Sequence, residues 1–395
     1  MYYENLISKR LGGKDFYKNS YYKFEKYSKL KRECQKQFPN TFLFDFGIGE
    51  SDLMPPQEVL DELAKQCYVY ENRIYADNGI TPYLEACLIH LKEVYGLENL
   101  SIKNINPCIG AKSALTIIPM AFVDDDDYII STIPGYDVLG NFAKWLNGKI
   151  YYAPLLEKND YLVDLDKIPL EVLKKTKLFI VNYPNNPTGA VSNKLFFEKL
   201  INLALTYNFL IVNDIVYGPL SKNPLSIFNC QNAYKCCIEV HSFSKAFNMT
   251  GMRIGFMLAN QTLINILKMV KDNMDSGQYI PIMYAAIKAV EIEKDYLPKL
   301  YNRFQKRKEL ISQVLKKHNL QVKVSEATFY LFLKVPKSFA SGDEFCRYLL
   351  EKFQIFVLPW DEVEGSVRLS MTFKSPNNDD ELFAKLLDER LKIIF

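Results

Sequence analysis

The sequence contains few of the residues on which metal sites and Ser–His–Asp triads rely. It has three histidines in 395 residues, and His90, His241 and His318 lie far apart in the chain. Its eight cysteines show no C-x-x-C spacing, and only Cys236 and Cys237 are adjacent. Adjacent residues on a strand point to opposite faces, so these two side chains are poor candidates for sharing a metal. The sequence therefore predicts no metal site and no histidine-based triad.

Long apolar runs and a strong net charge are also missing. No apolar run approaches the length of about 18 residues that a membrane span needs, and the first ten residues, MYYENLISKR, are polar. The net charge of +3 is too small, and the basic residues too evenly spread, to indicate a nucleic-acid partner. Cysteines within apolar runs favour a reducing compartment. We expect a soluble cytoplasmic protein that binds neither membrane nor nucleic acid.

Short apolar runs alternate with amphipathic segments through the middle of the chain. Helical patterns such as NKLFFEKLINLALTYN (193–208) separate most of these runs. Apolar strands that alternate with helices indicate a mainly parallel sheet covered on both faces, in an α/β fold. The runs of strand length lie at residues 127–132, 149–155, 177–183, 209–217, 237–244 and 254–260.

The pattern changes near residue 285. A long, highly charged helical stretch (284–318) is followed by short strands and helices up to the C-terminus, which predicts a smaller α+β domain. We expect three segments: an N-terminal arm that joins the small domain, a large domain, and a C-terminal small domain. Their expected ranges are residues 1–45, 46–285 and 286–395.

Two side chains with distinctive chemistry directly follow expected strands. Lys245 comes after CIEVHSFS, and Asp214 ends FLIVND. Taken alone, Lys245 is typical of a surface lysine and Asp214 of a helix cap. Ligands of open α/β sheets, however, bind beyond the carboxyl ends of the strands, where a lysine can form a Schiff base and a buried carboxylate needs a cation. Gly251 is expected to let the backbone turn between Lys245 and Arg253.

Further residues at strand ends suit a phosphate and a flat ring. The turn CIGAK (108–112) precedes an apolar helix, whose N-terminal N–H groups can bind an anion, and Arg253 offers a fork for the same phosphate. Tyr136 can stack on a ring, and Asn186 and Tyr217 can donate to a ring oxygen. With a lysine for an aldehyde and an aspartate for a pyridine nitrogen, the set predicts pyridoxal phosphate as the cofactor.

Four motifs in one order carry a family resemblance. SFSKAFNMTGMRIGF (242–256) follows NNPTG (185–189), Asp214 and Tyr217. From about residue 41 onward the chain resembles the fold-type-I pyridoxal-phosphate enzymes of the aspartate aminotransferase superfamily, in the class I/II group. The resemblance implies the fold of that group, in which a large domain with a mainly parallel, seven-stranded type of sheet between helices accompanies a smaller α+β domain.

The resemblance also implies a role for each residue that matches a cofactor motif. Lys245 would hold the cofactor as a Schiff base and shuttle a proton, and Asp214 would keep the pyridine nitrogen protonated. Asn186 and Tyr217 would contact the ring oxygen. The phosphate would be held by Ala111, Lys112, Ser242 and Arg253, and the ring would stack on Tyr136.

Other matches concern the substrate and a second subunit. Arg368 in SVRLSMT matches the arginine that binds the substrate α-carboxylate, and Gly49 in GIGESD matches the loop that closes over it. Asn186 is expected to contact substrate as well as cofactor. Tyr75 matches a tyrosine that reaches the phosphate of the neighbouring subunit. The resemblance thus implies a homodimer with shared active sites.

Some positions depart from many relatives, and others point to a branch. Ser51 stands where a proline commonly follows GIGE (47–50), and Leu84 stands where an arginine is common. GIGE and YADNG (75–79) look closest to the branch of LL-diaminopimelate aminotransferases. These departures put the identity of the substrate in doubt, but they leave the cofactor motifs intact.

The leading hypothesis is an aminotransferase that exchanges an amino group between an α-amino acid and a 2-oxo acid by a ping-pong mechanism. Lys245 and Asp214 would equally serve a β-lyase or a bond-forming biosynthetic enzyme of the same fold, because the bond held perpendicular to the ring selects the reaction. A remote alternative is a non-catalytic regulator domain that binds the same cofactor. The residues that would name the amino donor follow no fixed motif.

Overall fold

The computed structural model describes residues 5–15 and 23–392, and they form two compact units. Unit 2 is nearly continuous in sequence, whereas unit 1 is assembled from three pieces of chain. The chain passes from unit 1 to unit 2 at Gly49/Glu50 and back, within a long helix, at Arg303/Phe304, and it returns to unit 2 only for Glu326–Thr328. The domain limits expected at residues 45 and 285 stay a prediction. Unit 1 comprises Met1–Gly49, Phe304–Ser325 and Phe329–Phe395, and unit 2 comprises Glu50–Arg303 and Glu326–Thr328.

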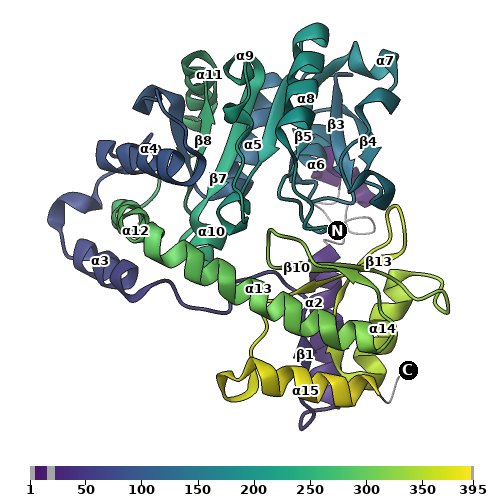
Figure 1. Ribbon diagram of the computed structural model, residues 1–395. Helices are drawn as coiled ribbons and strands as arrows, with labels where there is room; N and C mark the ends of the chain where they lie inside the picture. The colour runs from purple at the N-terminus through teal and green to yellow at the C-terminus, as the bar shows by residue number, and fades with distance from the viewer. Residues whose placement is uncertain (1–4, 16–22, 393–395) are drawn as a thin grey trace. The chain divides into compact units, whose positions relative to one another are not determined.

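Unit 2 is built on a seven-stranded sheet (Figure 1). Four neighbouring pairs, from β7 to β4, are parallel, and only β8 runs antiparallel to both of its neighbours. The predicted α/β fold with a mainly parallel sheet is therefore confirmed. In spatial order the strands are β2 (Ile105–Cys108), β8 (Gly255–Ala259), β7 (Cys237–Ser242), β6 (Leu210–Asp214), β5 (Thr176–Val181), β3 (Tyr128–Ile133) and β4 (Lys149–Pro154).

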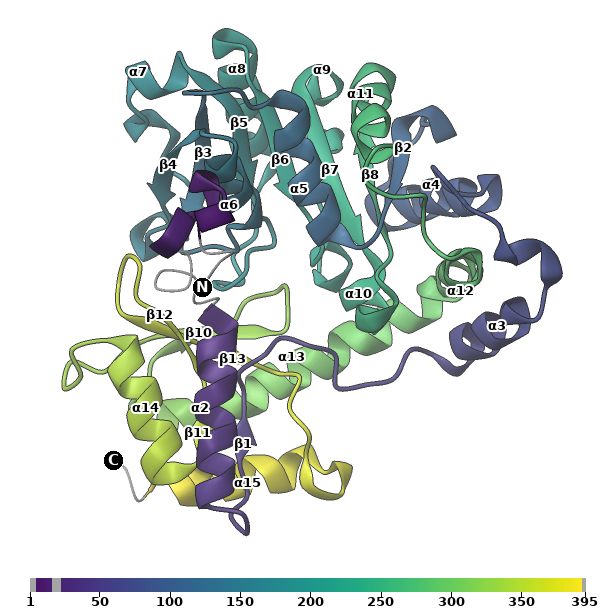
Figure 2. The same ribbon diagram turned by 180° about the vertical axis from the view of Figure 1, so that it is seen from behind.

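Helices cover both faces of this sheet, as Figure 1 and Figure 2 show from opposite sides. Apolar side chains of the helices and of the strand faces beneath them form two separate buried clusters. One face packs against α5 (Ala111–Phe122), α6 (Val138–Trp145) and α11 (Gln261–Lys271). The cluster on the other face includes α4 (Thr81–Tyr95), α8 (Lys194–Tyr207) and α9 (Ala233–Cys236), and it extends outward through α12 (Ile280–Glu291), which packs on α4, to α3 (Gln57–Cys67), which packs on α12.

Two details of unit 2 differ from the expectation. The helical stretch expected over 284–318 is two helices, because α12 ends at Glu291 and α13 (Glu293–Lys317) begins beyond Ile292. Ile292 has φ −99° and ψ −1°, and its side chain continues the helical pattern, so periodicity does not reveal the break. The edge strand β2 was not expected, since it has four residues and includes a proline.

Unit 1 contains an antiparallel sheet and a short parallel pair. The sheet has the order β12 (Leu358–Trp360), β13 (Ser366–Ser370), β10 (Tyr330–Lys334) and β9 (Val322–Lys323). The pair joins β1 (Phe44–Asp45) to β11 (Ile355–Phe356), residues far apart in sequence. The unit also contains α2 (Lys23–Gln37), α14 (Gly342–Phe353), α15 (Asp380–Leu391) and the C-terminal part of α13.

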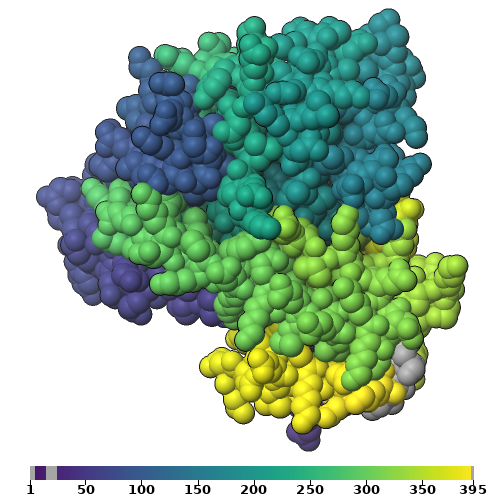
Figure 3. Space-filling view, in the orientation of Figure 1, coloured from purple at the N-terminus to yellow at the C-terminus, as the bar shows by residue number. Residues whose placement is uncertain are grey.

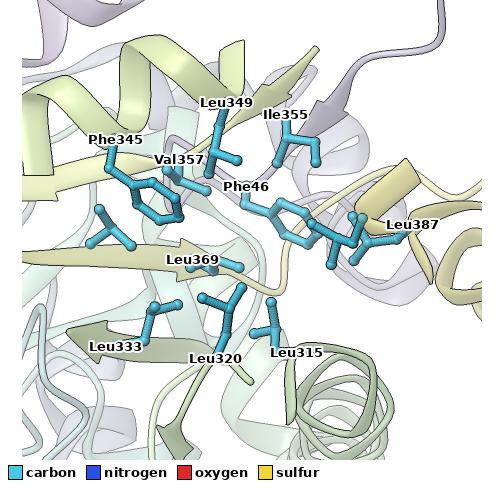
Figure 4. A pocket seen from close by; sticks show the side chains of 12 residues that line it. Phe46, Leu315, Leu320, Leu333, Phe345, Leu349, Ile355, Val357, Leu369 and Leu387 are labelled. Carbon is cyan, nitrogen blue, oxygen red and sulfur yellow. The ribbon is translucent and has the colours of Figure 1, made fainter. Parts of the chain in front are cut away.

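A small cavity inside unit 1 is lined only by apolar side chains. Figure 4 shows side chains from strands and helices that point toward one another around a cavity of about 20 Å³. Phe46, Leu333 and Leu369 reach it from the strand side, and Leu349 and Leu387 reach it from α14 and α15. A water there would find no hydrogen-bonding partner, so this space belongs to the packed core and is no ligand site.

The structure also bears on the features that the sequence lacks. Among residues 5–15 and 23–392, no helix has both the length and the apolarity needed to cross a membrane. Within the same ranges, no three His, Cys, Asp or Glu side chains gather as metal ligands would. The premise that Cys236 and Cys237 lie on one strand and point to opposite faces is wrong. Cys236 ends α9 and Cys237 begins β7, and their Sγ atoms lie 3.9 Å apart.

A buried ion pair fastens α15 to α13 within unit 1. Arg307, nearly inaccessible to solvent, donates two hydrogen bonds of 2.8 Å to the carboxylate of Asp380. It also donates to the carbonyls of Met371 and Phe373 at 2.8 and 3.0 Å. Replacing Arg307 leaves a partly buried carboxylate and two carbonyl groups without these donors.

We predict that Arg307→Met lowers the free energy of unfolding by about 3 kcal/mol. The preceding residue supplies the control, because Lys306 forms only an exposed pair with Glu381 at 3.5 Å. Lys306→Met should therefore change the free energy of unfolding by less than about 0.5 kcal/mol. Urea unfolding of both variants measures the difference. Equal effects of the two substitutions would contradict this account of the buried pair.

Candidate active site

Three adjacent parallel strands bring the predicted cofactor residues to one edge of the sheet in unit 2. Asp214 is the last residue of β6, Asn186 lies in the loop after β5, and Lys245 lies just beyond β7. The pairing of Asp214 with Val240 aligns the ends of β6 and β7. The carboxyl ends of parallel strands are where an open α/β sheet binds its ligand.

Asp214 carries a buried carboxyl group. Its Oδ1 accepts a hydrogen bond of 3.3 Å from the N–H of Val216, and its backbone carbonyl accepts one of 2.6 Å from Asn182 Nδ2. Burial raises the pKa of Asp214 from 3.8 to about 7, while the Val216 N–H and the positive charge of Lys245 act in the opposite direction. A cation brought to this carboxyl would favour its ionised form, so the site suits the protonated ring nitrogen of pyridoxal phosphate.

The loop after β5 is fixed by its own amides. Asn182 Oδ1 accepts from the N–H of Asn186 at 2.8 Å, and Asn185 Oδ1 accepts from both the N–H and the hydroxyl of Thr188. Asn186 is buried at the same edge as Asp214. The loop therefore holds the backbone of Asn186 in place, as a residue that contacts a ring oxygen requires.

Lys245 lies on α10 (Phe243–Ala246), a single helical turn that follows β7. Ser242 caps this turn, because its hydroxyl accepts from the N–H of Ser244 at 3.1 Å. Lys245 itself is half-buried. Its positive charge acts on the carboxyl of Asp214, so the two groups lie within electrostatic reach of each other.

The backbone turn between Lys245 and Arg253 does not use Gly251, so that expectation is wrong. The residues with positive φ are Asn248 and Arg253, both at 56°, and Gly251 sits in a 3-10 turn with open space around its α carbon. Asparagine tolerates the left-handed conformation, which explains the turn at Asn248 without a glycine.

A phosphate cradle is formed where α5 begins. Gly110 precedes the helix with φ +74°, and the guanidinium of Arg253 lies so close to its α carbon that a β carbon would collide with it. Arg253 is held in turn by a 2.8 Å hydrogen bond to the carbonyl of Thr250. Ala111 and Lys112 form the first helical residues, and N–H groups there point out of the helix end. A helix N-terminus beside an arginine suits a phosphate group.

Strand register brings Ser242 to the same cradle. Ser242 pairs with Gly255 of β8, and Gly255 pairs with Cys108 at the end of β2. Gly255 follows Arg253 by two residues and Cys108 precedes Gly110 by two, so the register aligns Ser242 with both segments of the cradle.

Tyr136 and Tyr217 occupy neighbouring places at the carboxyl edge. Tyr136 lies three residues beyond β3 and is half-buried. The next residue, Asp137, caps α6 and accepts from Ser131 Oγ at 2.9 Å, which anchors the loop that carries Tyr136. Tyr217 lies three residues beyond β6 and is buried. Both predicted ring contacts thus belong to the edge that carries Asp214.

Two of the predicted substrate residues, Arg368 and Gly49, lie together in unit 1, whereas Asn186 lies in unit 2. Arg368 of β13 is buried, donates to the carbonyl of Gly47 at 2.8 Å and lies over the ring of Tyr330 at 4.3 Å. The Tyr330 hydroxyl lies against the α carbon of Gly49, where a β carbon would collide with it. Glycine is therefore required at position 49 by this close approach.

Tyr75 lies on the surface of unit 2. Its side chain is 80% exposed and follows a short stretch with other exposed aromatic residues. Sequence reasoning missed Gln278, whose Nε2 donates to the carbonyls of Met252 and Arg253 at 3.0 and 2.5 Å and so braces the cradle arginine. No local pattern around Gln278 indicates this role.

The raised pKa of Asp214 predicts how the stability of the cofactor-free protein depends on pH. The folded-state pKa of about 7 lies above the ordinary value of 3.8, so the folded protein binds more protons between these two pH values. The contribution of Asp214 to stability therefore falls as pH rises from about 4 to 7. Asp214→Asn should gain stability relative to the wild type between pH 5 and pH 8, as measured by urea unfolding. A difference that does not change with pH would contradict this assignment.

Comparison with known proteins supports the same assignment from outside the structure. Residues 42–386 match the family model for aminotransferase class I and II. The chain is 37% identical to the LL-diaminopimelate aminotransferase of Methanocaldococcus jannaschii, over 94% of this chain and 91% of that protein. It is 34% identical to the LL-diaminopimelate aminotransferase of Methanococcus maripaludis, over 95% of this chain and 92% of that one.

A solved structure is also similar throughout its length. An aminotransferase from Staphylococcus aureus superposes with a TM-score of 0.83 and 27% identity, over 90% of this chain and 94% of that chain. Family membership implies pyridoxal phosphate as cofactor and an amino acid and a 2-oxo acid as substrates. The chain belongs to the aminotransferase class I and II family, and it is a fold-type-I aminotransferase.

Proposed function

We propose that this aminotransferase acts on LL-diaminopimelate, with pyridoxal phosphate held at the carboxyl edge of the sheet in unit 2. The observation that carries the cofactor site is the buried carboxyl of Asp214 beside the charge of Lys245, at the edge that also bears the phosphate cradle. The substrate is suggested by the two archaeal relatives, which are named for it and cover nearly the whole chain.

Each group of the cofactor finds a counterpart among the described residues. Arg253, Ser242 and the first N–H groups of α5, at Ala111 and Lys112, would hold the phosphate. Asp214 would face the ring nitrogen. The ring oxygen would lie by Asn186 and Tyr217, and the ring would stack on Tyr136. When bound, the cofactor supplies an electron-accepting ring.

The chain's own residues then divide the remaining work. Asp214, ionised by the facing cation, keeps the ring nitrogen protonated. The amine of Lys245 would move a proton between the α carbon of the substrate and the cofactor. Arg368 would bind the α-carboxylate in a bidentate manner, and the loop that contains Gly49 would close over it.

The two alternatives keep the same cofactor site. A β-lyase or bond-forming enzyme would use Lys245 and Asp214 equally, and a regulator domain would need no turnover. Both relatives described above bear an aminotransferase name, and the similar solved structure is also an aminotransferase. The kinetic requirement for a 2-oxo acid acceptor separates an aminotransferase from a lyase.

We predict that LL-diaminopimelate alone converts the cofactor once per active site, seen as a stoichiometric fall in its visible absorbance. Continued turnover should then require a 2-oxo acid. L-Lysine, which lacks the distal carboxylate, should react more slowly than LL-diaminopimelate. Lys245→Ala should lower the rate by about 10²–10⁴-fold.

Lys235→Ala is the control, because Lys235 is an exposed lysine on α9 just before the same strand. It should keep the wild-type rate. Turnover of LL-diaminopimelate without any 2-oxo acid would instead indicate a lyase. A faster reaction with L-lysine would reject LL-diaminopimelate as the preferred donor.

We also propose a homodimer that shares its active sites. Tyr68, Tyr70, Ile74 and Tyr75 are exposed together on the segment after α3, which is an unusual amount of apolar surface for one stretch of chain. In Figure 3 the surface of this part of unit 2 lies next to that of α12. Tyr75, 80% exposed, is free of burial in its own chain and would reach the phosphate cradle of a second copy. A cytoplasmic location remains a prediction.

We expect the chain to have twice the mass of one 45.8 kDa subunit in light scattering after gel filtration. Tyr70→Asp combined with Ile74→Asp should produce monomers, because it places charges in the apolar surface. Leu195→Asp is the control, since Leu195 is equally exposed on α8. A wild-type monomer, or a monomer produced by Leu195→Asp alone, would contradict the assigned interface.

A further inference from the structure

Three polar side chains connect separate segments of unit 2 beside the predicted lysine. The hydroxyl of Ser51 donates to Asn248 Oδ1, and Asn248 Nδ2 donates to the hydroxyl of Tyr296. Ser51 lies two residues after Gly49, and Asn248 lies three residues after Lys245. Tyr296 belongs to the first turns of α13. None of the three has a part in the cofactor site described above.

Asn248 is the centre of this link. It is buried, and it has the left-handed φ of 56° with which the chain turns away from Lys245. Its amide uses the oxygen toward Ser51 and the nitrogen toward Tyr296. The folded state is destabilised when the oxygen or the nitrogen of a buried amide has no hydrogen-bonding partner. Both contacts therefore hold the amide, and with it the backbone turn, in one place.

Tyr296 supports the lysine segment through its ring as well as its hydroxyl. Its ring stacks on Phe247 at 6.2 Å and an angle of 17°, and Phe247 stacks on Phe243 at 5.5 Å and 27°. Phe243 and Phe247 lie two residues before and after Lys245. Tyr296 thus fixes both the turn and the aromatic residues on either side of the lysine.

A second contact joins the same helix to the residue after Ser51. Arg303 donates two hydrogen bonds, of 3.1 and 2.6 Å, to the carboxylate of Asp52, whose side chain is only 5% exposed. Arg303 follows Tyr296 by seven residues, which is two helical turns, so both project from one side of α13. The helix therefore holds the segment 51–52 at one position and the turn after Lys245 at another.

We propose that Ser51, Asn248 and Tyr296 act as positioning residues that order the segment directly after Gly49, residues 50–52, and the Lys245 segment together. The inference rests on the proposed function, in which the loop closes over the substrate carboxylate and Lys245 moves the proton. If residues 50–52 became disordered, the turn after Lys245 would lose a hydrogen bond that fixes it. If that turn became mobile, residues 50–52 would in the same way lose a fixed contact. The link supplies geometry, and it makes no contact with the reacting atoms.

Kinetics of single and double variants test whether the link acts as one unit. Ser51→Ala and Tyr296→Phe should each lower kcat/KM for the amino donor by about tenfold. The double variant should be no more than about twofold worse than the more damaging single one, because either change breaks the same link. Ser51→Thr keeps the hydroxyl and should retain the wild-type value.

Asn248 offers a variant that separates the amide from the backbone. Asn248→Gly accepts the positive φ without strain but removes both hydrogen bonds, so it should match the double variant. Ser312→Ala and Tyr27→Phe are controls that each remove one hydroxyl hydrogen bond elsewhere, to the carbonyl of Glu309 and to the carboxylate of Asp343. Both should keep the wild-type kcat/KM.

Hydrogen exchange gives a readout that needs no substrate. The hydroxyl that Tyr296→Phe removes is bonded to Asn248, and Asn248 is bonded to Ser51. Tyr296→Phe should therefore raise the rate of amide exchange at residues 50–53. Ser51→Ala should raise exchange at residues 247–250. The measurement is made on the full chain loaded with pyridoxal phosphate and on the chain without it.

The two readouts keep failure of the link distinct from failure of the proposed substrate. If another amino acid proves to be the donor, the same kinetic cycle is run with it, and the exchange result is unaffected. Multiplied losses in the double variant, together with exchange changes confined to the substituted residue's own segment, would overturn the proposal.

Discussion

The buried carboxyl of Asp214 is the constraint around which the site in unit 2 is arranged. Parallel strands β5, β6 and β7 end at the same edge of the sheet, so the loops that follow them lie close together. Asp214 is the last residue of β6, the central strand of the three. Burial alone pushes this carboxyl toward its neutral form, as its raised pKa of about 7 shows. A cation opposite Asp214 favours its ionised form, so the fold favours a ligand with a positive group at this place.

The segment from Ser242 to Arg253 contains two residues with a left-handed backbone conformation, Asn248 and Arg253, and each has a different role. Asn248 turns the chain after the lysine and uses its amide to bind neighbouring segments. Arg253 turns it again and lays its guanidinium against Gly110 at the start of α5. The strained backbone conformation thus occurs at two residues whose side chains form specific contacts. Gly251, which lies between them, does not have a positive φ.

Much of this architecture could be predicted from the sequence, and the limits have physical causes. Apolar runs with helical spacers indicated the sheet, and motifs in a fixed order indicated the cofactor residues, because both signals are local. The break at Ile292 and the strand β2 escaped, since a one-residue kink and a four-residue edge strand hardly disturb the pattern. The contacts of Gln278, Ser51 and Tyr296 escaped because each joins segments distant in sequence.

The ion pair of Asp52 and Arg303 joins the two ends of the main segment of unit 2. The two residues are 251 positions apart, directly inside the points where the chain enters and leaves unit 2. Unit 2 is therefore an insertion whose two ends are tied together within it, whereas unit 1 needs β1 to pair with β11 across that whole insertion. During synthesis the strand β1 must wait, unpaired, until more than 300 further residues have been added, so unit 2 has the means to complete its fold first.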